Sequence, residues 1–174
     1  SSEGEIPQTV VGSVLAVADK LDSVISFFKQ GMIPTGSNDP YALRRQTIGI
    51  VQIIEANNWS FSFQELLEAA VQNIYGLNDA AQIAALVEDI AAFTKSRVLQ
   101  KLQNYHISHD IQDAILHAEN DDILMSIQNA QTLAKHQSDE DYKRVVEALA
   151  RVVNISSKEK EPFDVDVALF ETAS

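Results

Sequence analysis

Two aspartates and two arginines carry the strongest chemical signal in this sequence. Asp19 and Asp22 lie three residues apart in the apolar segment VLAVADKLD, which places both carboxylates on one side of a helix. Arg44 and Arg45 end the segment GMIPTGSNDPYALRR, in which a Gly/Pro loop leads into a second helix. Paired carboxylates suit a metal ion or an ion pair, and guanidinium groups suit a phosphate or a carboxylate.

The twin arginines have two alternative roles. Neighbouring helical residues point about 100° apart, so Arg44 and Arg45 are not expected to face one and the same partner side chain. One of them could pair with Asp19, Asp22 or Asp39 and hold the loop against the first helix. The other could bind a phosphate, helped by the positive N-terminus of the second helix.

Basic residues are sparse in the first half of the chain. Ahead of Lys95 there are only Lys20, Lys29, Arg44 and Arg45, all close to the loop. The formal net charge of −12 would repel a polyanion and argues against autonomous nucleic-acid binding. A local contact between this basic cluster and a phosphate backbone is compatible with that charge.

The sequence predicts no catalytic centre. A divalent ion needs several fixed ligands, and the four histidines, His106, His109, His117 and His136, all lie far behind Asp19. There is no Gly-rich phosphate loop, no nucleophile with a matching base, and no cysteine for a thiolate site. We therefore predict neither a catalytic residue nor a metal site, and expect Asp19 to serve the structure through hydrogen bonds or ion pairs.

The composition is that of an ordinary globular protein. The chain has 174 residues, of which 45% are hydrophobic, enough for one domain or two small ones. No apolar run approaches the roughly 20 residues needed to cross a bilayer, and no signal-peptide pattern opens the chain. We expect a cytoplasmic protein that does not contact a membrane.

Apolar residues recur at helical spacing throughout, so the predicted fold class is all-α, a bundle of about six to seven helices. The first helix shows the pattern in the stripe Val11, Val14, Ala18, Leu21, Ile25 and Phe28. Asp39 is expected to cap the second helix with Pro40 in its first turn, and Ser62 to cap the third. The helices are predicted over residues 9–30, 40–57, 63–75 and 79–105, then from Ser108, from Asp121, and over 138–155.

Two parts are expected along the chain. Residues 1–77 form the first part, and residues 78–174 form a second helical part with an extended tail. The stretch 156–162 has the charged composition of a linker, and residues 163–170 alternate polar and apolar types, as a short docking segment would. Both ends are abrupt, which favours a piece of a larger protein.

The first segments together resemble the β subunit of the bacterial heterotetrameric glycyl-tRNA synthetase. Its loop reads much like GLIPTGSKDPFALRR, close to GMIPTGSNDPYALRR here. Looser similarity continues through LLEAAVQNIY, DIQDAIL and RVVNIS farther along the chain. The resemblance is specific from about Val11 to Ile54 and supportive beyond it. It implies that residues 1–77 are the C-terminal part of an HD-like helical domain, followed by a helical linker subdomain.

The resemblance also implies a function. The chain would belong to a glycine–tRNA ligase, an aminoacyl-tRNA synthetase of protein biosynthesis, and would help to bind and position tRNA(Gly) for ATP-dependent glycylation. Its partners would be the α subunit, in an α2β2 assembly, and the tRNA. ATP and Mg²⁺ would bind at the α subunit, with no cofactor in this chain. Candidate tRNA contacts are Arg44, Arg45, Lys29 and Lys20. Asp19 and Asp22 would be structural or vestigial carboxylates of the HD-like fold.

Two other classes stay open. A non-catalytic helical protein-interaction module would explain the caps, the apolar stripes and the acidity without RNA. It would not explain why Asp19, the Pro-Thr-Gly loop and the twin arginines occur together. A remnant HD phosphohydrolase would place a metal ligand at Asp19. Its partner ligands, a histidine and a His-Asp pair on earlier helices, are missing, and His109-Asp110 comes in the wrong chain order.

Overall fold

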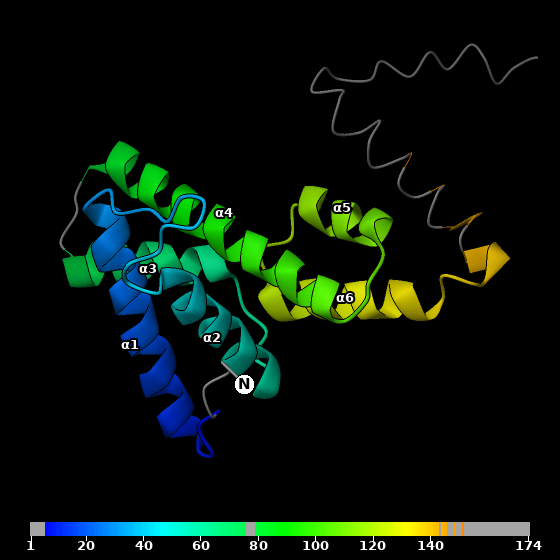
Figure 1. Ribbon diagram of the computed structural model, residues 1–174, viewed down its shortest axis with the longest axis horizontal. Helices are drawn as coiled ribbons and strands as arrows, with labels where there is room; N and C mark the ends of the chain where they lie inside the picture. Colours follow the sequence, from blue (N-terminus) through cyan, green and yellow to red (C-terminus); the bar gives the residue numbers. More distant parts are fainter. Residues whose placement is uncertain (1–5, 76–78, 143, 146–147, 149–150, 152–174) are drawn as a thin grey trace, which may run out of the picture. The chain divides into compact units, whose positions relative to one another are not determined.

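The computed structural model describes residues 6–75, 79–142, 144, 145, 148 and 151. Apart from one isolated bridge between Thr35 and Asn38, the regular structure of these residues is helical, which confirms the all-α class. The six helices with defined bounds are α1 (Val10–Lys29), α2 (Leu43–Ala56), α3 (Phe63–Tyr75), α4 (Ala80–Asn104), α5 (His109–His117) and α6 (Ile123–Lys135) (Figure 1).

Helix α1 begins where the sequence predicts. The Thr9 hydroxyl accepts a hydrogen bond from the Gly12 amide at 3.0 Å and caps the helix. Its buried face contains Val17, Leu21, Val24, Ile25 and Phe28. Three members of the predicted stripe were wrongly assigned, because Val11 and Val14 are 70% and 51% exposed and Ala18 is exposed as well. At this end of α1 the buried side chain is Ser13, whose hydroxyl accepts a hydrogen bond from the Asn57 amide beyond the end of α2.

Helix α2 begins three residues later than the sequence predicts. Asp39 does cap it, since its two carboxylate oxygens accept the backbone N–H groups of Leu43 at 2.8 Å and Arg44 at 3.0 Å. Pro40, however, lies in a turn ahead of the helix, and Ala42 takes a left-handed φ of 53°. This conformation, which is strained for a residue with a side chain, lets the chain turn back so that the carboxylate reaches both amides.

The loop between α5 and α6 fixes the start of α3. The Ser62 hydroxyl accepts the Glu65 backbone N–H at 3.1 Å, as predicted for a capping residue. The Asp121 carboxylate accepts hydrogen bonds from that hydroxyl and, at 3.1 Å, from the Gln64 backbone N–H. One helix start is therefore stabilised by a carboxylate nearly sixty residues away in sequence.

Helix α4 is the central helix, since it contacts four of the other five. Its 25 residues span about 37 Å at 1.5 Å per residue. It packs against α1, α2, α3 and α5, and its second half carries the contact with the end of α2, where Lys101 lies 2.8 Å from Glu55. Figure 1 shows α5 beside this second half. The buried residues of α4, which recur at three- and four-residue steps, are Ile83, Leu86, Val87, Ile90, Thr94, Val98 and Leu102, while Phe93 is half-buried.

Contacts group residues 1–134 into one compact unit and residues 135–174 into another. The predicted division after residue 77 falls at the undescribed residues 76–78, inside the first unit, and stays a prediction. In the second unit Asp139 caps a helical turn, because its carboxylate accepts the Asp141 and Tyr142 amides. The predicted linker and extended tail lie outside the described residues. No helix in the described ranges is long and apolar enough to cross a bilayer.

Candidate functional site

A groove with a volume of about 670 Å³ opens where α1, α2 and α4 meet, and we call it the basic groove. Five of its side chains are basic: one from α1, two from the start of α2 and two from α4. Four carry amides, and one is a carboxylate. The lining residues are Ile6, Lys20, Asp39, Ala42, Arg44, Arg45, Gln46, Ile48, Gly49, Gln52, Ile53, Arg97, Gln100, Lys101 and Asn104.

The carboxylate of the groove is already engaged. Both oxygens of Asp39 accept backbone amides at the start of α2. Its negative charge therefore faces the positive end of the helix dipole, a stabilising arrangement. The Asp39 carboxylate forms no ion pair within 4.0 Å with the guanidinium group of Arg44 or Arg45.

Arg44 and Arg45 both line the basic groove, Arg44 half-buried and Arg45 exposed. The expectation that they do not face one and the same partner side chain stays a prediction, because two side chains about 100° apart on one helix can line one groove and still contact different groups. Within the described residues, neither arginine forms an ion pair with Asp19 or Asp39. The arginine–carboxylate clamp considered from the sequence therefore has no support from these two carboxylates.

Arg97 is a groove residue that the sequence reasoning missed. Its Nε and Nη2 donate to the Ser96 hydroxyl, both at 3.2 Å, and its Nη1 donates to the Gln100 side chain at 3.0 Å. The guanidinium lies 5.5 Å from the ring centre of Phe93. Burial lowers the pKa of Arg97, the nearby charge of Arg44 lowers it further, and Asp39 raises it in part. Two guanidinium groups from different helices therefore share one electrostatic environment.

Lys101, four residues farther along α4, is held by α2. Its ammonium lies 2.8 Å from the Glu55 carboxylate, which also accepts the Tyr105 hydroxyl at 3.0 Å. Burial lowers the pKa of Lys101, but the bonds to Glu55 and Tyr105 and the charge of Glu55 raise it more, so that the net shift is upward. The charge of Lys101 is therefore compensated by Glu55, and this ion pair connects α4 to α2 beside the groove. Arg97 and Lys101 are four residues apart, and this spacing in the sequence indicates that both lie on one face of the helix.

Lys20 reaches the groove from α1. Its side chain lies across Gly49 of α2, so close that an ideal β-carbon at Gly49 would stand 2.9 Å from Lys20 Cε and 3.8 Å from Nζ. The absence of a side chain at Gly49 thus provides the path along which the lysine stem enters the groove. No carboxylate among the described residues lies within 4.0 Å of the Lys20 ammonium.

The other candidates from the sequence lie elsewhere. Lys29 is exposed at the end of α1, nine residues or about 14 Å along the helix from Lys20, and does not line the groove. Asp19 and Asp22 are also exposed and outside it. In the described ranges, no three His, Asp or Glu side chains are grouped so that they could hold a metal ion.

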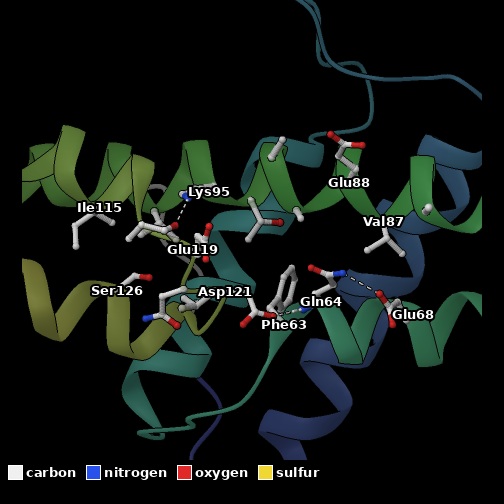
Figure 2. Close-up of a pocket in the computed structure, with 18 residues that line it drawn as sticks. Phe63, Gln64, Glu68, Val87, Glu88, Lys95, Ile115, Glu119, Asp121 and Ser126 are labelled. Carbon is white, nitrogen blue, oxygen red and sulfur yellow. Dashed lines mark hydrogen bonds between the residues drawn. The ribbon is translucent and has the colours of Figure 1, made fainter. Parts of the chain in front are cut away.

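A second cavity, of about 540 Å³, lies between α3, α4, α5 and α6 (Figure 2). Its polar groups mainly join helices. Lys95 donates to the Ala118 carbonyl at 3.1 Å, and Gln64 donates to Glu68 at 2.9 Å, as the dashed lines in Figure 2 show. Asp121 binds the start of α3 as described above. Lys95, Gln64, Glu68 and Asp121 therefore serve contacts between or within the helices around this cavity.

Comparisons with known proteins show which family the chain resembles over most of its length. A family described as glycyl-tRNA synthetase beta subunit matches residues 1–117. The chain is similar to the glycine–tRNA ligase beta subunits of Lacticaseibacillus casei (strain BL23), 43% identical over 176 residues, and Lactobacillus gasseri, 43% over 179 residues. It is 40% identical over 171 residues to that of Streptococcus agalactiae serotype III. These alignments cover 98 to 100% of this chain and 24 to 26% of the relatives, so the chain spans about a quarter of their length.

Proposed function

The chain belongs to the glycyl-tRNA synthetase beta subunit family, and on that premise we propose that it helps to bind and position tRNA(Gly) for glycylation. In this proposal it works with an α subunit in an α2β2 enzyme of the cytoplasm. The α subunit binds ATP and Mg²⁺ and forms the activated amino acid. The residues of this chain supply no catalytic group and act only on the tRNA.

The observation that supports the proposal is the basic groove of an otherwise acidic chain. Lys20, Arg44, Arg45 and Arg97 come from three helices and converge on one groove, and within the described residues none of them forms an ion pair. The chain as a whole carries a net charge of −12. A concentrated positive field in an acidic surface attracts a polyanion to that one place and repels it elsewhere.

The chemistry of the side chains suits a phosphodiester backbone. Guanidinium groups donate two parallel hydrogen bonds to a phosphate, and Arg44 and Arg45 offer two such groups at the start of one helix. Lys20 adds a point charge from the opposite wall. Phosphate contacts of this kind fix the register and orientation of a nucleic acid without reading its sequence, as expected of a segment that positions tRNA.

One observation favours a second function, a protein-interaction module. The first turns of α1 expose Val10, Val11, Val14 and Leu15, with exposed fractions between 51 and 70%. Apolar side chains gathered on one helix end are typical of a surface that docks another protein. This function and tRNA positioning are compatible, since a synthetase segment can contact both. The remnant phosphohydrolase has no such support, because the described residues do not bring metal ligands together.

The experiment that tests the proposal uses a relative as host. This chain replaces the matching quarter of the L. casei beta subunit, and the chimera is captured with the tagged α subunit of that species and assayed for tRNA charging. We expect capture and charging. Replacing Arg44 and Arg45 by Gln should raise the KM for tRNA, while ATP–pyrophosphate exchange with glycine stays unchanged.

Two results would contradict the proposal. If exchange falls together with charging, the arginines support the structure or the assembly rather than the tRNA. If the chimera is captured but its KM does not respond to the arginine substitutions, the basic groove does not contact the tRNA. The matched control removes two positive charges outside the groove, by Lys135→Gln and Arg144→Gln, and should leave the KM unchanged.

A further inference from the structure

We propose that the basic groove binds the paired ribose–phosphate backbone of an RNA stem, with its cations on phosphates and its amides on 2′-hydroxyl groups. This inference rests on the proposed function and adds to it the form of nucleic acid that the groove takes. It also assigns roles to Gln46, Gln52 and Asn104, which neither the basic cluster of the sequence nor the family resemblance singles out.

The amides of the groove are available for a ligand. Gln46 and Gln52 lie on α2 and Asn104 lies on α4, all as lining residues. In the described part of the chain, their side chains form no hydrogen bond with the protein, unlike Gln100, which accepts from Arg97 at 3.0 Å. An amide presents a donor and an acceptor side by side. A 2′-hydroxyl is both a donor and an acceptor, so the two groups are complementary, and DNA lacks this group.

The lining also indicates which RNA conformation fits. None of the described lining residues is aromatic, whereas grooves that hold unpaired nucleotides stack the bases on aromatic rings. Two rings that contact groove residues are engaged, Phe93 with the Arg97 guanidinium and Tyr105 with Glu55 and Lys101. A groove of cations and amides without a stacking surface contacts backbone only. The wide, shallow minor groove of an RNA stem presents such a backbone, with its 2′-hydroxyls exposed.

The walls of the groove are held in place before a ligand arrives. Lys101 is joined to Glu55 across α4 and α2, and the Lys20 stem lies on Gly49 across α1 and α2. Fixed spacing between the three helices favours a ligand of regular geometry, because binding then orders few protein groups. A regular stem meets this condition better than a single strand, which must itself be ordered.

The test compares three probes of one length: an RNA hairpin, the DNA hairpin of the same sequence, and an RNA of the same composition in which one arm is scrambled so that it stays single-stranded. Affinities for the 174-residue chain are measured by fluorescence anisotropy at low salt. We expect the RNA hairpin to bind about three- to tenfold more tightly than either other probe, the effect of one or two hydrogen bonds. The triple variant Gln46→Ala, Gln52→Ala and Asn104→Ala should lower RNA affinity to that of DNA and leave DNA affinity unchanged.

The outcomes separate this inference from the proposed function. Equal affinity for the two hairpins, with both weakened by Arg44→Gln and Arg45→Gln, would overturn the ribose contact and leave a general phosphate groove. Tighter binding of the single-stranded probe would overturn the paired backbone. Absence of hairpin binding would also overturn the inference, and the KM of the chimeric enzyme would then decide separately whether the groove touches tRNA at all.

Discussion

The side chain of Lys20 on α1 lies across the α-carbon of Gly49 on α2, where a β-carbon would stand 2.9 Å from Lys20 Cε. The contact has two consequences. It places the Lys20 ammonium in the groove that the α2 arginines also line, and Lys20 is the one basic residue of α1 among the described lining residues. It also makes Gly49 a position at which stability and binding respond in opposite directions.

Gly49→Ala should therefore raise the free energy of unfolding of the chain and lower its affinity for RNA. Alanine is favoured over glycine inside a helix by up to about 1 kcal/mol, and the new methyl group meets only the far part of a flexible side chain. Lys20 must move out of its path, and we expect the KM for tRNA of the chimeric enzyme to rise about two- to threefold, the size of a weak surface charge contact. Thermal unfolding and charging kinetics measure the two effects.

A double variant provides the control for this prediction. In a Lys20→Ala background the methyl group at Gly49 displaces nothing, so Gly49→Ala should still stabilise the fold but no longer change the KM. An equal rise of the KM in both backgrounds would show that Gly49 acts through the helix itself rather than through Lys20.

The α2 arginines should determine the salt dependence of RNA binding. Each phosphate contact releases condensed counterions, so loss of one contact lowers the slope of log affinity against log salt by about 1. We expect Arg44→Gln with Arg45→Gln to lower the slope by about 1 to 2, measured by anisotropy over a salt series with the RNA hairpin. The Lys135→Gln and Arg144→Gln pair should leave the slope unchanged. An unchanged slope in the arginine variant would exclude phosphate as their partner.

The link between Glu55, Lys101 and Tyr105 predicts a loss of stability at alkaline pH. Burial lowers the pKa of Lys101, but its bonds to Glu55 and Tyr105 and the charge of Glu55 raise it above its ordinary value. Burial is the largest cause that raises the pKa of Tyr105 above its ordinary value. For both, the folded state holds its proton more tightly than the unfolded state, so this stabilisation is complete below the unfolded pKa. It is lost as the pH rises through the folded pKa, from about pH 10 upward.

Urea unfolding at pH 8 to 11 measures this loss, and Glu55→Gln should make the alkaline decline shallower. At neutral pH the same substitution should cost about 1 kcal/mol, because the ion pair is partly exposed and screened by solvent. A decline of the same steepness in the variant would mean that other groups cause it.

The Asp121 carboxylate should contribute measurably to stability from outside the basic groove. Asp121→Ala removes the acceptor of the Gln64 amide and the Ser62 hydroxyl at the start of α3, and we expect a loss of about 1 kcal/mol. RNA binding should not change. Asp113→Ala, an exposed substitution on α5 with the same change of charge, should stay within about 0.5 kcal/mol of the original chain. Equal losses for both variants would exclude the cap.

The sequence by itself determined the helices, because the signals that start and end them act within a few residues. Thr9, Asp39, Ser62 and Asp79 cap helices that begin one to four residues later, and apolar spacing predicts most of their buried faces. Where the prediction was wrong, at Pro40 and at Val11, Val14 and Ala18, the cause was not local. Because the Asp39 carboxylate accepts amides four and five residues ahead, α2 begins only at Leu43. Where α1 packs against the end of α2, the buried side chain is Ser13, bonded to Asn57, and not Val11 or Val14.

Only the tertiary structure decided which basic residues act together. The sequence groups Lys20, Lys29, Arg44 and Arg45 because they are neighbours along the chain. Packing of α4 against α1 and α2 instead brings in Arg97 and Lys101, more than fifty residues after the arginines. Lys29 lies about two and a half turns beyond Lys20 on α1 and outside the groove. Helix periodicity shows which face of a helix is buried but not which helix covers it, and that pairing creates the groove.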